Sequence, residues 1–185
     1  MKKTAVITGA SKGIGLACAK AFLRAGYSVV DASRTESGQI KNRNYRFIRT
    51  DVTKEKDVKQ MIEAAAVNGG IDVMICNAGF GRFANLADSK TKDFDEMFAV
   101  NVRGVYLCCK YSLPHMLSAG CGTIIMISSI AGKNGIATAS IYSASKHAVM
   151  GLASSLMAEV RKSGIRVVTV CPGYVDTNFF DNEGT

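Results

Sequence analysis

The amino-acid sequence predicts an α/β domain built on a doubly wound parallel sheet. Two observations carry this prediction. Segments with strand-like and helix-like patterns alternate along the chain, and the strand-like segments are apolar nearly throughout, as in residues 5–7, 73–76, 124–127 and 167–170. Strands of that kind are buried on both faces, as in a parallel sheet covered by helices. The length of 185 residues suits a single domain over residues 1–185.

The expected elements follow from local signals taken in chain order. A short β-rich run precedes a glycine-rich turn, and a helix with apolar residues at helical spacing then continues until Gly26. Thr53 is the expected cap of a second helix, which ends before the glycine pair 69–70. The expected strands cover residues 3–8, 28–33, 46–50, 72–76, 123–127 and 165–171, and the expected helices cover residues 13–25, 54–67, 91–117 and 140–162.

Composition excludes several classes of protein. Hydrophobic residues make up 48% of the chain and charged residues 21%, which are globular rather than disordered values. No apolar run approaches the roughly 20 residues that span a bilayer. The six cysteines and two histidines form no C-x-x-C pair and no zinc-ligand spacing. We therefore expect reduced thiols in a cytoplasmic protein, with no metal and no membrane partner.

The net charge of +8 calls for an anionic partner or for none. The basic stretch 41–49 carries Tyr45 and Phe47 between its cations, which is one way to build a nucleic-acid surface. The same stretch alternates as a half-buried strand does, so we interpret its cations as a solvated face. We expect no nucleic-acid partner and, instead, a small ligand that carries phosphate.

The turn after the first strand has the composition of a phosphate-binding loop. Gly9, Gly13 and Gly15 are spaced G-x-x-x-G-x-G and open directly into a helix. Glycines let the backbone approach a ligand closely, and the helix directs free N–H groups and its positive dipole end at the same spot. The pattern predicts a pyrophosphate site, and the alternative is a tight turn that binds nothing.

The end of the second strand predicts which dinucleotide binds. Arg34 offers a planar donor fork suited to a 2′-phosphate, and Lys12 adds a second cation. Asp31 is a contrary signal, because an acid at the end of this strand binds the free ribose of NAD. It lies two residues too early, however, and strand alternation places it opposite Ala32 and Arg34. We expect NADP(H) in preference to NAD(H).

A candidate acid–base group opens the helix at 140–162. Tyr142 and Lys146 are four residues apart and share one helix face. A free phenol has a pKa near about 10, and a cation one turn away is expected to lower it. Ser129 closes the fifth strand, where a hydroxyl can orient a substrate carbonyl. Asn101 is a poor interior helix residue, which suggests a buried partner or a bound water.

Together these motifs resemble the short-chain dehydrogenase/reductase family over the whole chain. The residues that match the family in order and spacing are Thr8-Gly9-x3-Gly13-x-Gly15, Asp51-Val52, Asn77-Ala78-Gly79, Asn101, Ser129, Tyr142-x3-Lys146 and Pro172-Gly173. The resemblance implies a Rossmann fold. It also implies an NADP-dependent oxidoreductase that transfers a hydride between NADP(H) and a carbonyl or secondary alcohol substrate.

The resemblance also implies a role for each site residue. Tyr142 resembles the general acid/base, Ser129 the substrate-orienting hydroxyl, and Lys146 the group that lowers the phenol pKa and binds the nicotinamide ribose. Asn101 would hold a water in a proton relay behind Lys146. The expected cofactor-binding residues are Gly9, Ser11, Lys12, Gly13, Ile14, Gly15, Ser33, Arg34, Asp51, Val52, Asn77, Ala78, Gly79, Tyr142, Lys146, Pro172, Gly173, Val175 and Thr177.

The chain departs from the family pattern at its C-terminal end. Family members usually continue through a substrate lid, a further helix and a seventh strand, whereas this sequence ends at Thr185. We therefore expect six strands, a truncated lid and little turnover. The family also implies a homodimer or homotetramer, and the helix at 140–162 is apolar on more than one face.

Two alternative functions stay open. A 3-oxoacyl-thioester (acyl-carrier-protein) reductase of fatty-acid synthesis shares these motifs, with Arg103 and Lys110 as candidate docking cations. A non-catalytic NADP-binding sensor or scaffold is the alternative of another class, although such a protein would be expected to lose Tyr142 or Lys146.

Overall fold

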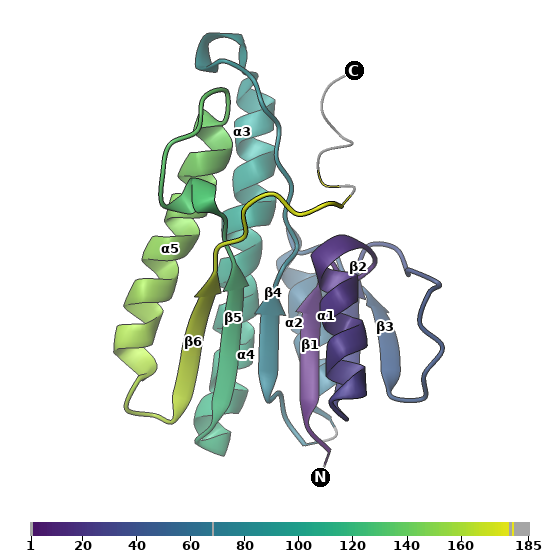
Figure 1. The fold of residues 1–185 in the computed structure, drawn as a ribbon. Helices are drawn as coiled ribbons and strands as arrows, with labels where there is room; N and C mark the ends of the chain where they lie inside the picture. The colour runs from purple at the N-terminus through teal and green to yellow at the C-terminus, as the bar shows by residue number, and fades with distance from the viewer. Residues whose placement is uncertain (1, 68, 178, 180–185) are drawn as a thin grey trace.

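Parallel strands form a six-stranded sheet in the computed structural model, which describes residues 2–67, 69–177 and 179 (Figure 1). The strand order is β3-β2-β1-β4-β5-β6, so the order reverses between β1 and β4, where ligands bind in such folds. This confirms the expected doubly wound sheet. The strands are β1 (Thr4–Thr8), β2 (Ser28–Ser33), β3 (Tyr45–Arg49), β4 (Val73–Cys76), β5 (Gly122–Ile127) and β6 (Ile165–Val170).

Helices cover the sheet from two sides (Figure 1). Helix α1 lies on one face, and α2, α4 and α5 lie on the other. The α-helices are α1 (Gly13–Arg24), α2 (Glu55–Ala66), α3 (Thr91–Phe98), α4 (Val105–Ala119) and α5 (Ser140–Val160). The shorter segments are η1 (Leu86–Asp88), η2 (Ala99–Gly104) and η3 (Ile130–Gly132).

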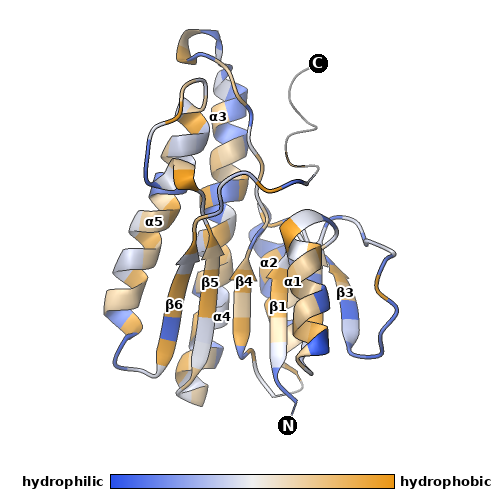
Figure 2. Ribbon diagram, in the orientation of Figure 1, coloured by the Kyte–Doolittle hydropathy of each residue, from blue (hydrophilic) through white to orange (hydrophobic). Residues whose placement is uncertain are grey.

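Successive residues of each central strand enter different halves of the core. In β1, Ala5 and Ile7 pack with α1, whereas Val6 packs with the helices on the opposite face. All of β1 and β4 is buried, which explains why these strands carry no charged residue. At the edge of the sheet, β6 alternates between buried and exposed positions, and Val168 and Val170 are each 42% exposed. Figure 2 shows β6 as mostly hydrophobic with a hydrophilic band near its start, so part of its exposed side is apolar.

The helix expected at 91–117 is interrupted. Helix α3 ends at Phe98, the π-helical segment η2 follows, and α4 then begins at Val105. Periodicity does not reveal such a wider turn, because it inserts one residue without ending the helix. Gly104 also permits a close approach here, since a Cβ on it would lie 2.9 Å from Cγ2 of Val52.

The expected cap of α2 is wrong. The cap position is Lys54, and the Thr53 hydroxyl donates instead to Oδ1 of Asp51 at 2.7 Å. The carboxylate competes for this hydroxyl because it lies two residues earlier in the same turn. None of the helices in the described ranges has the length and apolarity required to traverse a bilayer.

Candidate active site

A cleft of about 1650 Å³ lies at the carboxyl ends of the strands. It is the place where the doubly wound topology predicts a ligand. The sequence-predicted residues that line it are Gly9, Ser11, Lys12, Gly13, Ile14, Ser33, Arg34, Asp51, Val52, Asn77, Ala78, Gly79, Ser129, Tyr142, Lys146, Pro172, Gly173, Val175 and Thr177. Two predicted residues, Gly15 and Asn101, lie behind this lining and act through packing and hydrogen bonds.

The glycine loop brings bare backbone to one end of the cleft. Gly9 and Gly13 have φ values of +68° and +54°, which favour glycine. A Cβ on Gly15 would overlap the carbonyl oxygen of Gly9 and lie 2.5 Å from Nδ2 of Asn77. Gly15 therefore allows α1 to pack tightly against the loop. Gly9 and Gly13 shape the surface that a phosphate would meet.

One hydroxyl ties this loop to β4. Oγ1 of Thr8 accepts hydrogen bonds from the backbone N–H groups of Asn77 at 2.9 Å and Ala78 at 3.0 Å. In return, Nδ2 of Asn77 donates to the carbonyl oxygens of Thr8 at 2.8 Å and Gly9 at 3.1 Å. Hydrogen bonds between the ends of β1 and β4 thus hold the floor of the cleft together.

The chain after β6 passes over the cleft toward the glycine loop (Figure 1). The carbonyl oxygen of Pro172 accepts a hydrogen bond from the N–H of Ile130 at 3.0 Å, which fixes the start of this segment. Further along, Thr177 approaches the loop so closely that a Cβ on Gly13 would lie 3.5 Å from it. The segment after β6 therefore reaches from the end of the sheet to the glycine loop.

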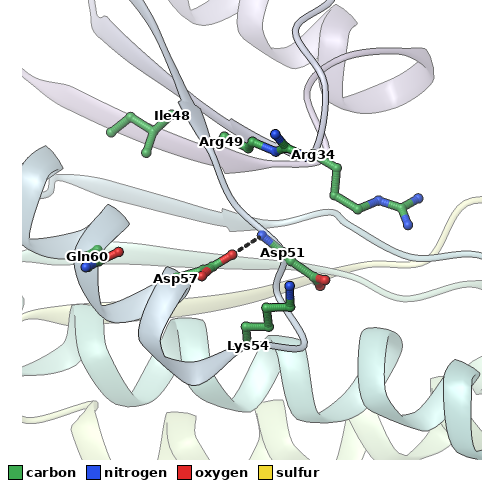
Figure 3. A pocket seen from close by; sticks show the side chains of 7 residues that line it. All are labelled: Arg34, Ile48, Arg49, Asp51, Lys54, Asp57 and Gln60. Atoms are coloured by element: carbon green, nitrogen blue, oxygen red, sulfur yellow. Dashed lines mark hydrogen bonds between the residues drawn. The ribbon is translucent and has the colours of Figure 1, made fainter.

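Cations gather at the corner of the cleft beyond β2. Figure 3 shows Arg34, Arg49 and Lys54 lining a pocket of about 400 Å³. Ser33 at the end of β2 pairs with Arg49 at the end of β3, and Arg34 directly follows Ser33. The two arginines therefore lie at neighbouring strand ends. A corner with this charge is suited to an anionic group.

Asp51 at this corner is held in its charged form. Its carboxylate accepts the N–H and the hydroxyl of Thr53, and its own N–H donates to Asp57 at 3.1 Å (Figure 3). Burial raises the pKa of Asp51, but the Thr53 hydrogen bonds and the charges of Lys54 and Arg34 outweigh it, so the net shift is downward.

The predicted acid–base residues meet at the other end of the cleft. Tyr142 and Lys146 lie one turn apart in α5, and Nζ of Lys146 lies 5.6 Å from the centroid of the Tyr142 ring. This ammonium donates to the carbonyl oxygen of Ile127 at 2.9 Å. Ser129, which follows β5 and caps η3, completes the group, and its Oγ accepts from the N–H of Ala131 at 3.2 Å.

The pKa of Tyr142 does not shift in the expected direction. Burial raises the pKa of this phenol, and a hydrogen bond with Ser129 offsets part of the rise. Burial also lowers the pKa of Lys146 to about 8, although the nearby Cys171 opposes this shift. The net shift of the Tyr142 pKa is therefore upward, against the expected direction, because desolvation of the phenol dominates.

Asn101 supports the site from below, in the π-helical segment η2. It is 1% exposed, and its amide exchanges two hydrogen bonds with the backbone of Phe80, at 2.9 and 3.0 Å. Its Nδ2 also donates to Oγ of Ser145 at 3.1 Å. A Cβ on Gly79 would lie 3.1 Å from Oδ1 of Asn101 and 3.5 Å from Nζ of Lys146. Asn101 therefore has the buried partner that was expected, and this partner is the loop after β4.

Aromatic residues that the motifs did not identify surround Tyr142. The rings of Phe83 and Phe179 lie 5.6 and 5.9 Å from the Tyr142 ring, measured between centroids. The guanidinium of Arg82, close by, is paired with Asp93. Phe83 follows the motif Asn77-Ala78-Gly79 at the end of β4, and this position in the sequence could have indicated that it lies near the site. No motif in the sequence indicates the same for Phe179. This wall is suited to an apolar substrate.

Comparisons with known proteins agree with this geometry. Residues 3–185 match the family model described as short chain dehydrogenase. The chain is 40% identical over 179 residues to dehydrogenase/reductase SDR family member 6 of Rattus norvegicus, covering 95% of this chain and 72% of that protein. It is 38% identical over 191 residues to 2-(R)-hydroxypropyl-CoM dehydrogenase of Xanthobacter autotrophicus, covering 96% and 76%.

Solved structures are similarly close. ElxO with NADP bound superposes with a TM-score of 0.93 at 36% identity, covering 98% of this chain and 77% of that one. A short-chain dehydrogenase/reductase of Burkholderia phymatum in complex with NAD superposes with a TM-score of 0.90 at 31% identity, covering 97% and 68%. The chain therefore belongs to the short-chain dehydrogenase/reductase family of oxidoreductases.

Proposed function

We propose that this chain is an NADP(H)-dependent oxidoreductase that interconverts a carbonyl compound and its secondary alcohol. The observation that carries the proposal is a single cleft that contains both the glycine loop and the Tyr142 phenol. A dinucleotide that spans the cleft would place its phosphates at one end and its reactive ring at the other. The small substrate would then lie against the aromatic wall around Tyr142.

The residues of the cleft fit a nicotinamide dinucleotide. The bare backbone at Gly9 and Gly13 would hold the pyrophosphate, and the amino end of α1 would favour its charge. Arg34 and Lys12 would hold a 2′-phosphate, which is the basis for proposing NADP(H). When bound, the nicotinamide supplies or accepts the hydride.

The chain itself provides the proton and the orientation. In the reducing direction the Ser129 hydroxyl orients the substrate carbonyl, and the Tyr142 hydroxyl gives its proton to the carbonyl oxygen as the carbon accepts the hydride. Because burial raises the pKa of Tyr142, the phenol holds this proton at neutral pH. The Lys146 ammonium, 5.6 Å from the ring centroid, stabilises the phenolate that remains.

Titration with NADPH and NADH, followed by nicotinamide fluorescence, tests the coenzyme. We expect tighter binding of NADPH, and Arg34→Asp should weaken NADPH at least about tenfold, or about 1.4 kcal/mol. Tighter binding of NADH to the unmodified chain would contradict the preference. Failure of both coenzymes to bind would contradict the proposed function.

A Tyr142→Phe variant tests the chemistry separately. It should bind NADPH as the unmodified chain does and lose reduction of a model ketone. If the variant reduces the ketone at the full rate, Tyr142 is not the acid. Little turnover is expected of this chain, so the sensor alternative is favoured only if the unmodified chain binds NADPH and shows no Tyr142-dependent reduction of any ketone in a panel.

The acyl-carrier alternative depends on free cations near the site. Arg103 and Lys110, the candidate docking residues, both pair with Glu55, at 3.6 and 3.0 Å. Their charge is partly neutralised within the chain, so this surface does not favour an acidic carrier. The proposal therefore keeps a small carbonyl compound as the substrate.

We also propose a homodimer or homotetramer. Tyr106 and Leu117 on α4 and Met157 on α5 are exposed large apolar residues, and such surfaces favour association. Light scattering at micromolar concentration is the test, and a monomer would contradict the proposal.

A further inference from the structure

A buried carboxylate lies behind the predicted adenosine end of the cleft. Asp31 in β2 is 0% exposed, and it accepts hydrogen bonds from the hydroxyls of Ser33 and Tyr45, the latter at 2.7 Å. Burial and the Asp31 carboxylate both raise the pKa of Tyr45, so the phenol stays protonated and donates. The strand alternation that places Asp31 opposite Ala32 also places it on the same face as Ser33.

The carboxylate decides what Ser33 can offer to a ligand. A serine hydroxyl has one proton and two lone pairs. The proton of Ser33 is used by Asp31, and Ser33 also lines the cleft. Its oxygen therefore faces the cleft as an acceptor, which can bind a hydroxyl group but cannot donate to a phosphate.

The position of Ser33 determines which part of a dinucleotide it would meet. The N–H of Gly9 donates to the carbonyl oxygen of Ala32 at 2.9 Å, so the phosphate loop lies against the end of β2. Ser33, the next residue, is therefore placed to meet the ribose next to a pyrophosphate held by this loop. Arg34, the next residue, favours a 2′-phosphate, whereas the Ser33 oxygen favours a free 2′-hydroxyl.

We propose that Asp31 is a positioning residue that turns Ser33 into an acceptor for the 2′-hydroxyl of the adenosine ribose, so that the site admits NAD(H) beside NADP(H). This inference rests on the proposed function. Tyr45 holds the carboxylate in place from β3. The network moderates the preference that Arg34 and Lys12 create, because it presents an acceptor oxygen of Ser33 beside the place where a 2′-phosphate would lie.

The test compares dissociation constants for NADH, NADPH and 2′-deoxy-NADH, which lacks the hydroxyl in question. Ser33→Ala should weaken NADH about fivefold, as expected for one hydrogen bond, and leave 2′-deoxy-NADH unchanged. Equal weakening of NADH and 2′-deoxy-NADH would overturn the proposal, because the serine would then not meet the 2′-hydroxyl.

A second variant removes the network without leaving a buried hydroxyl unpaired. Asp31→Val combined with Tyr45→Phe frees the Ser33 proton for donation and should raise the preference for NADPH over NADH about tenfold. An unchanged preference would overturn the role of Asp31, whereas absence of coenzyme binding to the unmodified chain would overturn the proposed function and this inference together.

The matched control is Asp72→Asn. This carboxylate also supports a strand, by accepting the N–H of Thr4 at 2.7 Å, but at the opposite end of the sheet. The control should lower stability and leave the NADPH-to-NADH preference unchanged. A preference that shifts equally in the control would show a general structural effect and overturn the assignment. If the double variant does not fold, the Ser33→Ala comparison still decides whether Ser33 meets the 2′-hydroxyl, and Tyr45→Phe alone, which releases the carboxylate from β3, should shift the preference in the same direction as the double variant if Asp31 sets it.

Discussion

Replacing Thr8 by valine tests how firmly the floor of the cleft is held. Oγ1 of Thr8 accepts the N–H groups of Asn77 and Ala78 at 2.9 and 3.0 Å, and it donates to Ile75 at 3.3 Å. Valine has nearly the same shape but no hydroxyl, so two half-buried N–H groups lose their acceptor. A fully buried donor without a partner costs about 1–3 kcal/mol, and these two are only half-buried, so we expect Thr8→Val to lower the free energy of unfolding by about 2–4 kcal/mol.

Equilibrium unfolding in urea measures this loss, with Thr8→Ser as the matched control. Serine keeps the hydroxyl and removes only a methyl group, so it should cost clearly less than valine. Coenzyme binding should weaken with Thr8→Val, because the same hydroxyl positions the loop after β4. Equal losses for the two variants, or a loss below about 1 kcal/mol for valine, would refute the hydrogen-bond account.

Three further predictions concern stability. Burial lowers the pKa of Lys146 to about 8 in the folded chain, below the roughly 10.4 of an unfolded lysine, so the folded state carries this charge at a cost. Lys146→Met should therefore raise the free energy of unfolding by on the order of 2 kcal/mol at pH 7. The difference between variant and unmodified chain should shrink between about pH 8 and 10, because there the unfolded unmodified chain binds more protons than the folded one. A difference in unfolding free energy that stays constant with pH in urea unfolding would contradict this. Gly15→Ala should lower the unfolding free energy by about 1–3 kcal/mol in the same assay, because its Cβ meets the Gly9 carbonyl, and a neutral result would show that the loop yields. Gly151→Ala, in α5, adds a Cβ with no heavy atom within 4 Å apart from its chain neighbours and the backbone of its own helix, so it should raise the unfolding free energy by about 0.5–1 kcal/mol, and a loss would mean that another surface covers this position.

The strands were predictable because most of them are buried on both faces and are therefore continuous apolar runs in the sequence. Every observed strand end lies within one residue of its expected position, and β2 has the predicted bounds of Ser28–Ser33. Apolar runs flanked by turn residues carry this information directly. The π-helical turn η2 was not predictable in the same way, since Asn101 looked like a misplaced polar residue rather than the centre of a distortion.

The site was predictable where a motif places a residue, and less so where distant segments meet. Nearly all of the expected cofactor residues line one cleft, because parallel strands end at one edge. The pKa of Tyr142 was predicted in the wrong direction, since spacing reveals Lys146 but not the burial of the phenol. The contact between Asp31 and Tyr45 joins neighbouring strands through their register, which no local pattern shows.

The π-helical turn η2 sets the rotation of α4 relative to α3 about their shared helical path. One additional residue in a turn changes the angular phase of everything that follows by about 100°. Before the turn, Met97 faces the aromatic wall of the cleft, and after it, Cys108 and Met116 face the sheet. Deleting a single residue from 99–104 would force one of these two surfaces away from its partner. Outside Asn101 and Gly104, this segment is therefore expected to tolerate substitution far better than deletion.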